Sequence, residues 1–225
     1  MTNDAPLQPE EQVQPLTWYL VRHGETDWNR AQRIQGQTDV PLNARGRRQI
    51  AALARRLHGT RFTAVYASDL SRTMQSARLL VGETALPIAP TPELREFSYG
   101  EWEGLTIAEV EARDADRFSR RLSGRNEDFA GPGGENTFDV LERVRRFHEQ
   151  TMQRHAPGEA VLVVGHGGSL RALLVCLLDL PPEHFWRVRL DVAALSIVRS
   201  YPQTGVLELW NDTSHQDNLD PTEEE

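Results

Sequence analysis

The sequence predicts an α/β fold: a three-layer αβα sandwich whose central sheet is mostly parallel and carries helices on both faces. Apolar segments of strand length alternate with amphipathic segments of helix length, a pattern typical of such a sheet. In addition, the apolar strands 17–21 and 161–164 run into Arg22-His23-Gly24 and Gly165-His166-Gly167. The carboxyl ends of parallel strands meet at one edge of an open sheet, so we expect the two histidines to face one anion there.

The chain suits one domain, at residues 17–210, with a terminal segment on each side. Residues 1–16, rich in Pro, Gln and Glu, are predicted to form a disordered N-terminal tail, and residues 211–225 an acidic C-terminal tail. Without these segments the chain has 24 acidic against 25 basic residues, although the net charge of the whole is −8. No basic excess indicates a nucleic-acid partner.

Several classes of protein are excluded by single residue types. All 25 basic residues are arginine, which excludes chemistry that needs lysine, such as a Walker-type phosphate loop or a Schiff base. Cys176, the single cysteine, lies in an apolar segment and is interpreted as a small buried hydrophobic residue. The sequence shows neither a membrane-spanning apolar run nor a signal-peptide pattern, so we expect a cytoplasmic protein without a membrane partner.

The first half of the chain contains the elements that surround the first histidine. After strand 17–21, residues 27–42 have no clean periodicity and are predicted to form a loop over the site. Asn43 is placed to cap the next helix, and its apolar residues repeat at helical spacing. These residues are Ile50, Leu53, Ala54 and Leu57. A strand at 62–67 then leads directly into a helix that ends near residue 80.

Arg72 stands in the first turn of that helix, just after a strand end. Free backbone N–H groups and the helix dipole favour an anion at such a position, and Arg72 adds a full positive charge. If Arg72 stood alone, we would interpret it as an ordinary solvated arginine of a helix. Together with the two histidine motifs, it is interpreted as part of an anion site.

The second half begins with an excursion from the sheet. A short strand at 88–89 precedes a small cap at about 98–134, with one or two charged helices over 105–130. Its arginines, Arg113, Arg117, Arg120, Arg121 and Arg125, alternate with acids and are interpreted as a solvated face. Thr137 is predicted to cap a helix that ends near His155 and buries Val140, Val144 and Phe147. The remaining elements are strand 161–164, helix 169–178 and two strands near 194–199 and 206–210.

These motifs, in this order, resemble the histidine phosphatase superfamily, also called phosphoglycerate-mutase-like. The resemblance covers residues 17–211 and includes Leu94-Arg95-Glu96 and Trp102-Glu103-Gly104 besides the two histidine motifs. It implies that His23 is the phosphorylated nucleophile and Glu96 the proton donor. Arg22, Arg72 and His166 correspond to the rest of the phosphate pocket. The residues expected to contact the substrate are Asn29, Gln35, Gly36, Tyr99 and Gly167.

Phosphoryl transfer explains why these residue types are needed. Its transition state spreads negative charge over three oxygens, which the planar guanidiniums of Arg22 and Arg72 can bind without a metal or cofactor. His23 must attack as a neutral imidazole, so nearby positive charge should lower its pKa and a backbone carbonyl should hold its other nitrogen. Glu96 must protonate the leaving alcohol and then accept a proton from water, and an arriving phosphate dianion favours its protonated form.

The resemblance favours a metal-independent hydrolase of small phosphorylated metabolites, of broad specificity, with Trp102 helping to shape a broad pocket. A cofactor-dependent phosphoglycerate mutase is the alternative, because Tyr99 stands three residues after Glu96 as in the mutase branch. The lysine of that branch corresponds to Ile107 here, and its Arg-Arg-Ser-Tyr segment and longer insertion are missing.

A non-catalytic phospho-ligand binding module is the alternative of another class. Such a module would be expected to lack the nucleophile or the acid, whereas both are present. The substrate is left open among sugar phosphates, phosphoglycerates, nucleotide-pathway esters, phosphopeptides and α-ribazole phosphate. The assembly is left open between monomer and homodimer.

Overall fold

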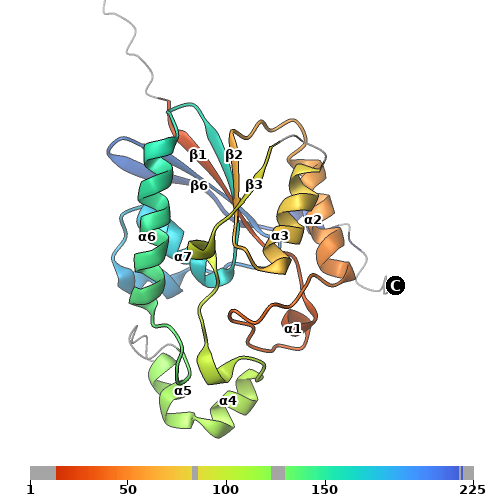
Figure 1. Cartoon of the computed structure of the whole chain (residues 1–225), viewed down its shortest axis with the longest axis vertical. Helices are drawn as coiled ribbons and strands as arrows, with labels where there is room; N and C mark the ends of the chain where they lie inside the picture. The colour runs from red at the N-terminus through yellow and green to blue at the C-terminus, as the bar shows by residue number, and fades with distance from the viewer. Residues whose placement is uncertain (1–13, 83–85, 123–129, 218, 220–225) are drawn as a thin grey trace, which may run out of the picture.

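A computed structural model describes residues 14–82, 86–122, 130–217 and 219 of the chain (Figure 1). Its six-stranded sheet has the order β3-β2-β4-β1-β5-β6. The strands are β1 (Leu16–Arg22), β2 (Ala64–Ala67), β3 (Ile88–Pro90), β4 (Ala160–Gly165), β5 (Leu195–Tyr201) and β6 (Thr204–Asp212). Strands β1 to β4 are mutually parallel, while β5 and β6 are antiparallel to their neighbours. The predicted α/β class with a mostly parallel sheet is confirmed.

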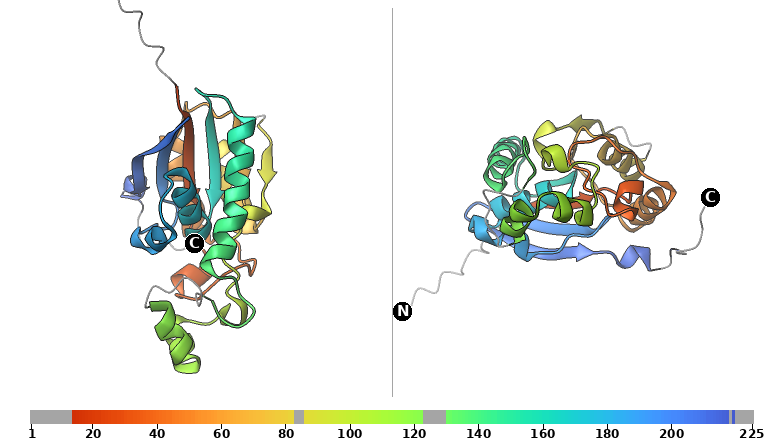
Figure 2. Two further views of the ribbon diagram at one scale, coloured as in Figure 1. Left: turned by 90° about the vertical axis from the view of Figure 1, so that its left-hand side faces the viewer. Right: turned by 90° about the horizontal axis from the view of Figure 1, so that it is seen from below.

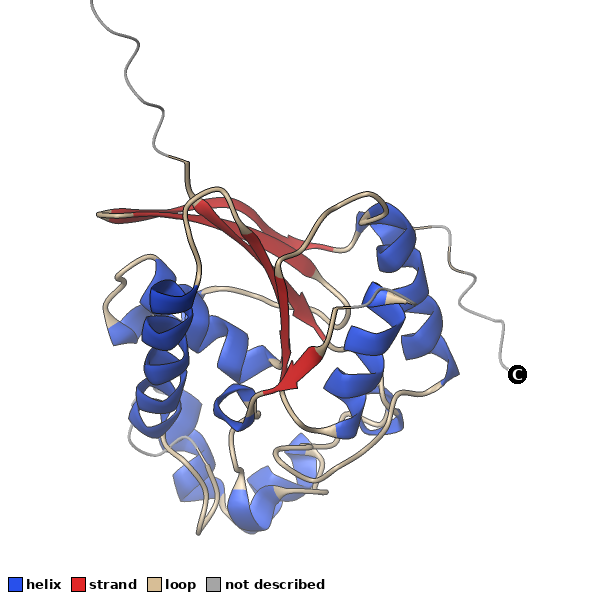
Figure 3. Ribbon diagram, turned by 45° about the horizontal axis from the view of Figure 1, so that its top comes forward, coloured by secondary structure: helices blue, strands red, loops and turns tan. Residues whose placement is uncertain are grey.

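Helices cover both faces of this sheet, as Figures 1 and 3 show, with α6 and α7 on one side and α2 and α3 on the other. The α-helices are α1 (Asp27–Arg30), α2 (Ala44–Arg56), α3 (Ser71–Val81), α4 (Ile107–Arg113), α5 (Ala115–Leu122), α6 (Thr137–Arg154) and α7 (Gly167–Leu177). Short 3-10 helices are η1 (Pro92–Leu94), η2 (Gly100–Trp102), η4 (Pro182–Arg187) and η5 (Ser214–Gln216).

The two halves of the core follow from the alternation of side chains along each strand. Trp18 and Leu20 of β1 pack into the cluster that contains residues of α6 and α7. Val21 packs on the opposite face, with Ile50 and Leu53 of α2. Because both faces are covered, β1 and β4 read as nearly continuous apolar runs, which is typical of buried parallel strands.

The sheet register brings three strand ends to one edge. Arg22 pairs with Gly165 across β1 and β4, and Ala67 pairs with Val164 across β2 and β4. The residues that follow these strands, His23, His166 and Ser68, therefore emerge side by side. Helix α1 and the α4–α5 cap lie at this same end of the sheet (Figure 2).

Several predicted boundaries differ from those observed. Residues 27–42 are not all loop, because Thr26 forms a capping box with Asn29 and starts the short helix α1. Helix α6 is capped by Asn136, not Thr137: the Asn136 side chain accepts bonds from two free backbone N–H groups of the first turn. The Thr137 hydroxyl is buried and has no hydrogen-bond partner among the described residues.

The fold also continues past residue 210, where the domain was expected to end. Strand β6 reaches Asp212, which forms an ion pair with Arg56 of α2 at 2.5 Å. Gln216 then accepts a hydrogen bond from Gln49 at 3.0 Å. At the other end, β1 starts at Leu16, and residues 1–13 of the expected N-terminal tail lie outside the described part of the chain.

Three smaller expectations concern exposure. Ala54 is half-buried, and Ala52 takes its place in the buried stripe of α2. Cys176 is half-buried rather than buried, and its surroundings raise the pKa of its thiol to about 11, mainly by desolvation. Of the cap arginines, Arg113 pairs with Glu101, in keeping with a solvated face. The side chains of Arg120, Arg121 and Arg125 lie outside the described part.

No helix in the described ranges is long and apolar enough to cross a bilayer.

Candidate active site

A pocket of about 140 Å³ lies where the strands β1, β2 and β4 end. It is lined by Arg22, His23, Asn29, Arg33, Ile34, Gln35, Gly36, Arg72, Glu96 and Tyr99. Eight of these ten were expected to be catalytic or to contact the substrate. The other two expected residues, His166 and Gly167, do not line the pocket but adjoin it.

His23 follows β1 and is almost fully buried, at 2% exposure. Its Nδ1 lies 2.7 Å from the carbonyl oxygen of Gly24, and a carbonyl can only accept, so Nδ1 carries the proton. The lone pair of the neutral ring is then on Nε2. Burial, and next the positive charges of Arg72 and Arg22, hold the pKa of His23 well below its ordinary value. His23 is thus a neutral imidazole with an unprotonated nitrogen at neutral pH.

His166 caps α7 and is fully buried. Its ring lies against that of His23, with 5.1 Å between the centroids. Arg72 donates to Nδ1 at 3.3 Å, so the proton of the neutral ring is on Nε2, which donates to the Ser68 hydroxyl at 2.9 Å. The pKa of His166 is lowered strongly by burial, then by Arg72 and His23.

The two arginines supply the positive charge of the pocket. Arg72, fully buried in the first turn of α3, donates to the carbonyls of Gly36 at 2.7 Å and Thr38 at 2.9 Å. Burial lowers the pKa of Arg72 to about 10, so it stays charged at neutral pH. Arg22 donates through Nη1 to Leu190 at 2.6 Å, while its buried Nε finds no hydrogen-bond partner among the described residues. Desolvation lowers the pKa of Arg22, and Glu96 opposes that effect.

Glu96 is held by the amino end of α7. Its Oε1 accepts from the backbone N–H of Gly168 at 2.9 Å and from that of Phe97 at 3.0 Å. A Cβ at position 168 would collide with Glu96 Oε1 and the Phe97 ring, so only glycine allows this approach. Gly167 adjoins the same space, because a Cβ placed there would lie 3.6 Å from both Arg22 Cζ and Glu96 Oε2.

The remaining expected contact residues reach the pocket from α1, the loop that follows it and the cap. Asn29 accepts from the backbone and hydroxyl of Thr26, which fixes its side chain in the α1 capping box. Gln35 is buried, and its Oε1 has no hydrogen-bond partner within the described ranges. Gly36 has φ +55°, and a Cβ there would meet the Glu103 carboxylate, so glycine is required. Tyr99 packs against the Phe97 ring at 5.8 Å between centroids.

Trp102 does not shape the pocket, contrary to expectation. It is fully buried with Ile34, Val110 and Phe118, and its indole donates to Asp114 at 3.0 Å. Its large apolar surface therefore holds the cap together. Ile107, at the position of the mutase lysine, is 42% exposed at the start of α4.

Three residues of the site were not found from the sequence. Ser68 is hydrogen-bonded to His166 Nε2 at 2.9 Å, and its signal was its place directly after β2. Arg33 lines the pocket and donates to the Gly104 carbonyl at 2.7 Å, but the loop that carries it has no readable period. Arg171, one helical turn after Gly167, donates to the carbonyl of that residue at 3.0 Å and lies over Trp186 at 5.4 Å. Helical spacing could have indicated Arg171.

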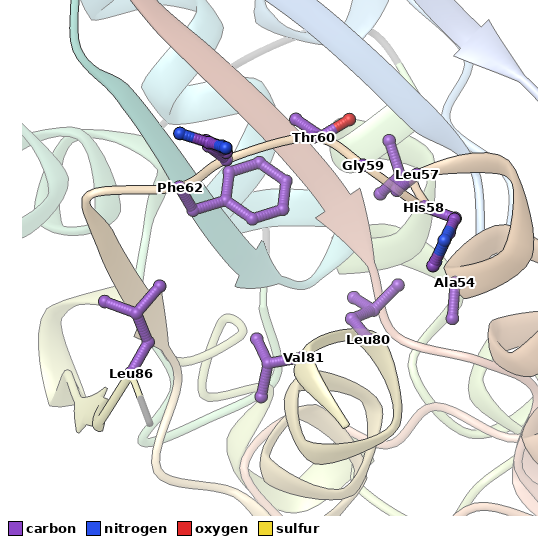
Figure 4. Close-up of a pocket in the computed structure, with 10 residues that line it drawn as sticks. Ala54, Leu57, His58, Gly59, Thr60, Phe62, Leu80, Val81 and Leu86 are labelled. Atoms are coloured by element: carbon purple, nitrogen blue, oxygen red, sulfur yellow. The ribbon is translucent and has the colours of Figure 1, made fainter. Parts of the chain in front are cut away.

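A wider hollow of about 410 Å³ lies at the opposite edge of the sheet, before β2 and β3 (Figure 4). Its walls are mainly apolar, with Leu57, Phe62, Leu80 and Val81 among them. None of the five residues proposed for catalysis reaches it, so its size has no bearing on the chemistry above. In the described ranges, no three His, Cys, Asp or Glu side chains are grouped to hold a metal ion.

Comparisons with known proteins relate the whole chain to a family. The sequence profile of the histidine phosphatase superfamily (branch 1) matches residues 18–213. A Yersinia enterocolitica protein named probable phosphoglycerate mutase GpmB is 35% identical over 208 residues, which cover 90% of this chain and 95% of that protein. The metal-independent phosphoserine phosphatase of Arabidopsis thaliana is 37% identical over 87% of this chain and 81% of its own. The crystal structure of the α-ribazole phosphatase from Shigella flexneri superposes with a TM-score of 0.80 at 29% identity, covering 88% of this chain and 97% of that one.

Proposed function

Since the chain belongs to the histidine phosphatase superfamily, branch 1, we propose that it is a metal-independent phosphatase that hydrolyses small phosphate monoesters through a phosphohistidine at His23. One observation carries the proposal. A neutral, buried imidazole with an unprotonated Nε2 shares a small pocket with two guanidiniums and a carboxyl group.

In the first step, the Nε2 lone pair of His23 attacks phosphorus and the bond from phosphorus to the ester oxygen breaks. Glu96, in its protonated form, gives its proton to the departing alkoxide, which leaves as an alcohol. In the second step, water attacks the phosphohistidine, Glu96 takes a proton from that water, and the P–N bond breaks. Inorganic phosphate leaves, and His23 is again neutral.

The positive groups act on the charge of the transferring group. The buried guanidiniums of Arg22 and Arg72 neutralise its oxygens. The Arg22 Nε, which has no hydrogen-bond partner among the described residues, is a donor available for one of them. His166 lies against His23 and keeps Arg72 directed toward the pocket. Because the arginines are already fixed by carbonyls, little reorganisation is needed when phosphate enters.

The pocket volume limits the substrate. About 140 Å³ accommodates a phosphoryl group and a few attached atoms, so the rest of a larger substrate extends out of the pocket. This supports small phosphorylated metabolites and broad specificity. Relatives named as phosphatases of phosphoserine and of α-ribazole phosphate support the same class. A cytoplasmic location, and a monomer or homodimer, stay predictions for fractionation and size-exclusion chromatography to test.

The central test is the covalent intermediate. After rapid acid-free quenching of a reaction with ³²P-labelled substrate, we expect wild-type protein to carry label that is alkali-stable and acid-labile, as a phosphohistidine is. His23→Ala should carry none and should lose about 10³-fold or more in kcat, while EDTA should leave the wild-type rate unchanged. Normal hydrolysis of p-nitrophenyl phosphate by His23→Ala would rule out the proposal.

A phosphoglycerate mutase is the second candidate, favoured by the Yersinia relatives and by Tyr99 at the pocket. A mutase would convert 3-phosphoglycerate to 2-phosphoglycerate when primed with 2,3-bisphosphoglycerate, whereas we expect release of phosphate to dominate. Following both products by ³¹P NMR separates the two activities. Turnover of any phosphomonoester would also dismiss a non-catalytic binding module.

A further inference from the structure

A partly buried ion pair holds the loop that carries Glu96. Arg143 of α6 and Glu135, just before that helix, have side chains only 11% and 23% exposed. Arg143 Nε lies 2.9 Å from one carboxylate oxygen of Glu135, and Nη2 lies 3.0 Å from the other. Two parallel bonds between planar groups fix the guanidinium in one orientation.

The remaining donors of Arg143 bind the backbone of the acid-bearing loop. Nη1 donates to the carbonyls of Glu93 at 2.6 Å and Arg95 at 2.7 Å, and Nη2 donates to that of Glu96 at 3.0 Å. Three carbonyls within four residues therefore converge on one side chain from another element. This leaves the main chain at Glu96 little freedom to shift relative to α6.

Glu135 extends the same support to the phosphate side of the pocket. Its Oε2 accepts from the backbone N–H of Ser98 at 2.8 Å and from the Gln37 amide at 3.4 Å. That amide also lies 3.2 Å from the Glu96 carbonyl. Gln37 directly follows Gly36, whose carbonyl holds Arg72. The ion pair thus connects the loop of the acid with the loop of the phosphate pocket.

We propose that Arg143 and Glu135 form a positioning unit that places the Glu96 carboxyl group at the oxygen of the leaving group. The inference rests on the proposed function, in which Glu96 is the proton donor. Neither residue lines the pocket, so both act through Glu96. Lysine cannot replace Arg143, because an ammonium group has three donors and no fork, whereas Arg143 makes five hydrogen bonds here.

The test compares two esters of similar shape, p-nitrophenyl phosphate and phenyl phosphate. Nitrophenolate leaves without help, whereas phenolate benefits from a proton. In Arg143→Lys and in Glu135→Gln, we expect kcat/KM for phenyl phosphate to fall about 10-fold or more and kcat/KM for p-nitrophenyl phosphate to fall less than about 3-fold. The ratio kcat/KM reports the step in which the alcohol leaves, whereas kcat also includes the hydrolysis of the phosphohistidine, which is the same for both esters. Circular dichroism checks that each variant is folded, and Glu135→Gln carries the test if Arg143→Lys is not.

Arg146→Lys is the matched control on the same helix, because Arg146 is 54% exposed and pairs across the surface with Glu142 at 3.0 Å. It should leave both rates unchanged. In a double-mutant cycle, adding Arg143→Lys to Glu96→Gln should lower kcat/KM for phenyl phosphate by less than about 2-fold, because the acid that Arg143 positions is already gone.

Two failures can be told apart. If Glu96→Gln lowers kcat/KM selectively for phenyl phosphate but Arg143→Lys and Glu135→Gln lower it equally for both esters, the positioning inference is wrong and the proposed function stands. If Glu96→Gln itself lowers kcat/KM equally for both esters, the assignment of the acid is wrong, and the inference falls with it.

Discussion

At Gly168 the amino end of α7 contacts the side chain of Glu96. The Gly168 N–H contacts both carboxylate oxygens of Glu96, at 2.9 and 3.2 Å. The contact needs a residue without a side chain, because a Cβ would occupy the space of the carboxylate and of the Phe97 ring. At the scale of single residues, the position of the Glu96 carboxyl group thus depends on the absence of a side chain at position 168.

Gly168→Ala is therefore expected to displace the proton donor and to lower kcat for phenyl phosphate about 10²-fold or more, the usual worth of general acid catalysis. Steady-state kinetics measures this, and circular dichroism checks the fold. Gly167→Ala is the comparison: its nearest atom would be Arg171 Nη1 at 3.2 Å, the far end of a flexible side chain, so its loss should be smaller. Wild-type rates in Gly168→Ala would contradict this account of the acid.

Helix α6 connects the core of the protein to the candidate active site. Its amino end is fixed by the Asn136 side chain, which accepts from the N–H groups of Phe138 and Asp139 at 2.8 and 3.1 Å. Its inner face carries Val140, Val144 and Phe147 into the core. The same helix presents Arg143 to the acid-bearing loop, so one element connects core packing to the site.

The assignment of Asn136 as the N-cap residue of α6 gives a prediction about stability. Asn136→Ala should lower the free energy of unfolding by about 1 kcal/mol, because two helix N–H groups lose their acceptor. Thr137→Val should be neutral or stabilising, since the buried Thr137 hydroxyl has no partner among the described residues. Urea denaturation of both variants measures the difference. A larger loss in Thr137→Val than in Asn136→Ala would restore Thr137 as the cap.

The whole molecule couples its stability to the protonation of the pocket. His23 and His166 are neutral in the fold, with pKa values held well below the ordinary value mainly by burial. In the unfolded chain they would titrate near pH 6.5. Below that pH the unfolded state binds more protons than the native state, so native stability must fall as the pH falls.

We therefore expect the free energy of unfolding to decrease between about pH 6.5 and pH 5, where the unfolded histidines take up protons. His166→Asn should flatten this dependence. Carboxylates whose pKa values are lowered by ion pairs, such as Asp69 beside Arg95, lose their stabilising effect only at lower pH. Urea denaturation at several pH values between about 5 and 6.5 measures how the free energy of unfolding changes with pH. The same pH dependence in His166→Asn as in the wild type would contradict the prediction.

The sequence by itself determined the fold class and most of the candidate site. Apolar runs that end in His23-Gly24 and His166-Gly167 show where strands stop, and a parallel sheet must bring such ends to one edge. Arg72 was found because a strand runs directly into its helix. These features are local, so a linear pattern carries them.

Only the tertiary structure decided how these side chains are held. Arg143 and Glu135 have no distinctive local pattern, yet they hold the backbone of the loop that carries the acid. The wrong expectation for Trp102 has the same origin, because an aromatic residue near a motif can face a pocket or a core. Strand pairing and helix packing choose among such orientations through contacts between residues far apart in the chain, and the sequence pattern around each residue does not encode its partners.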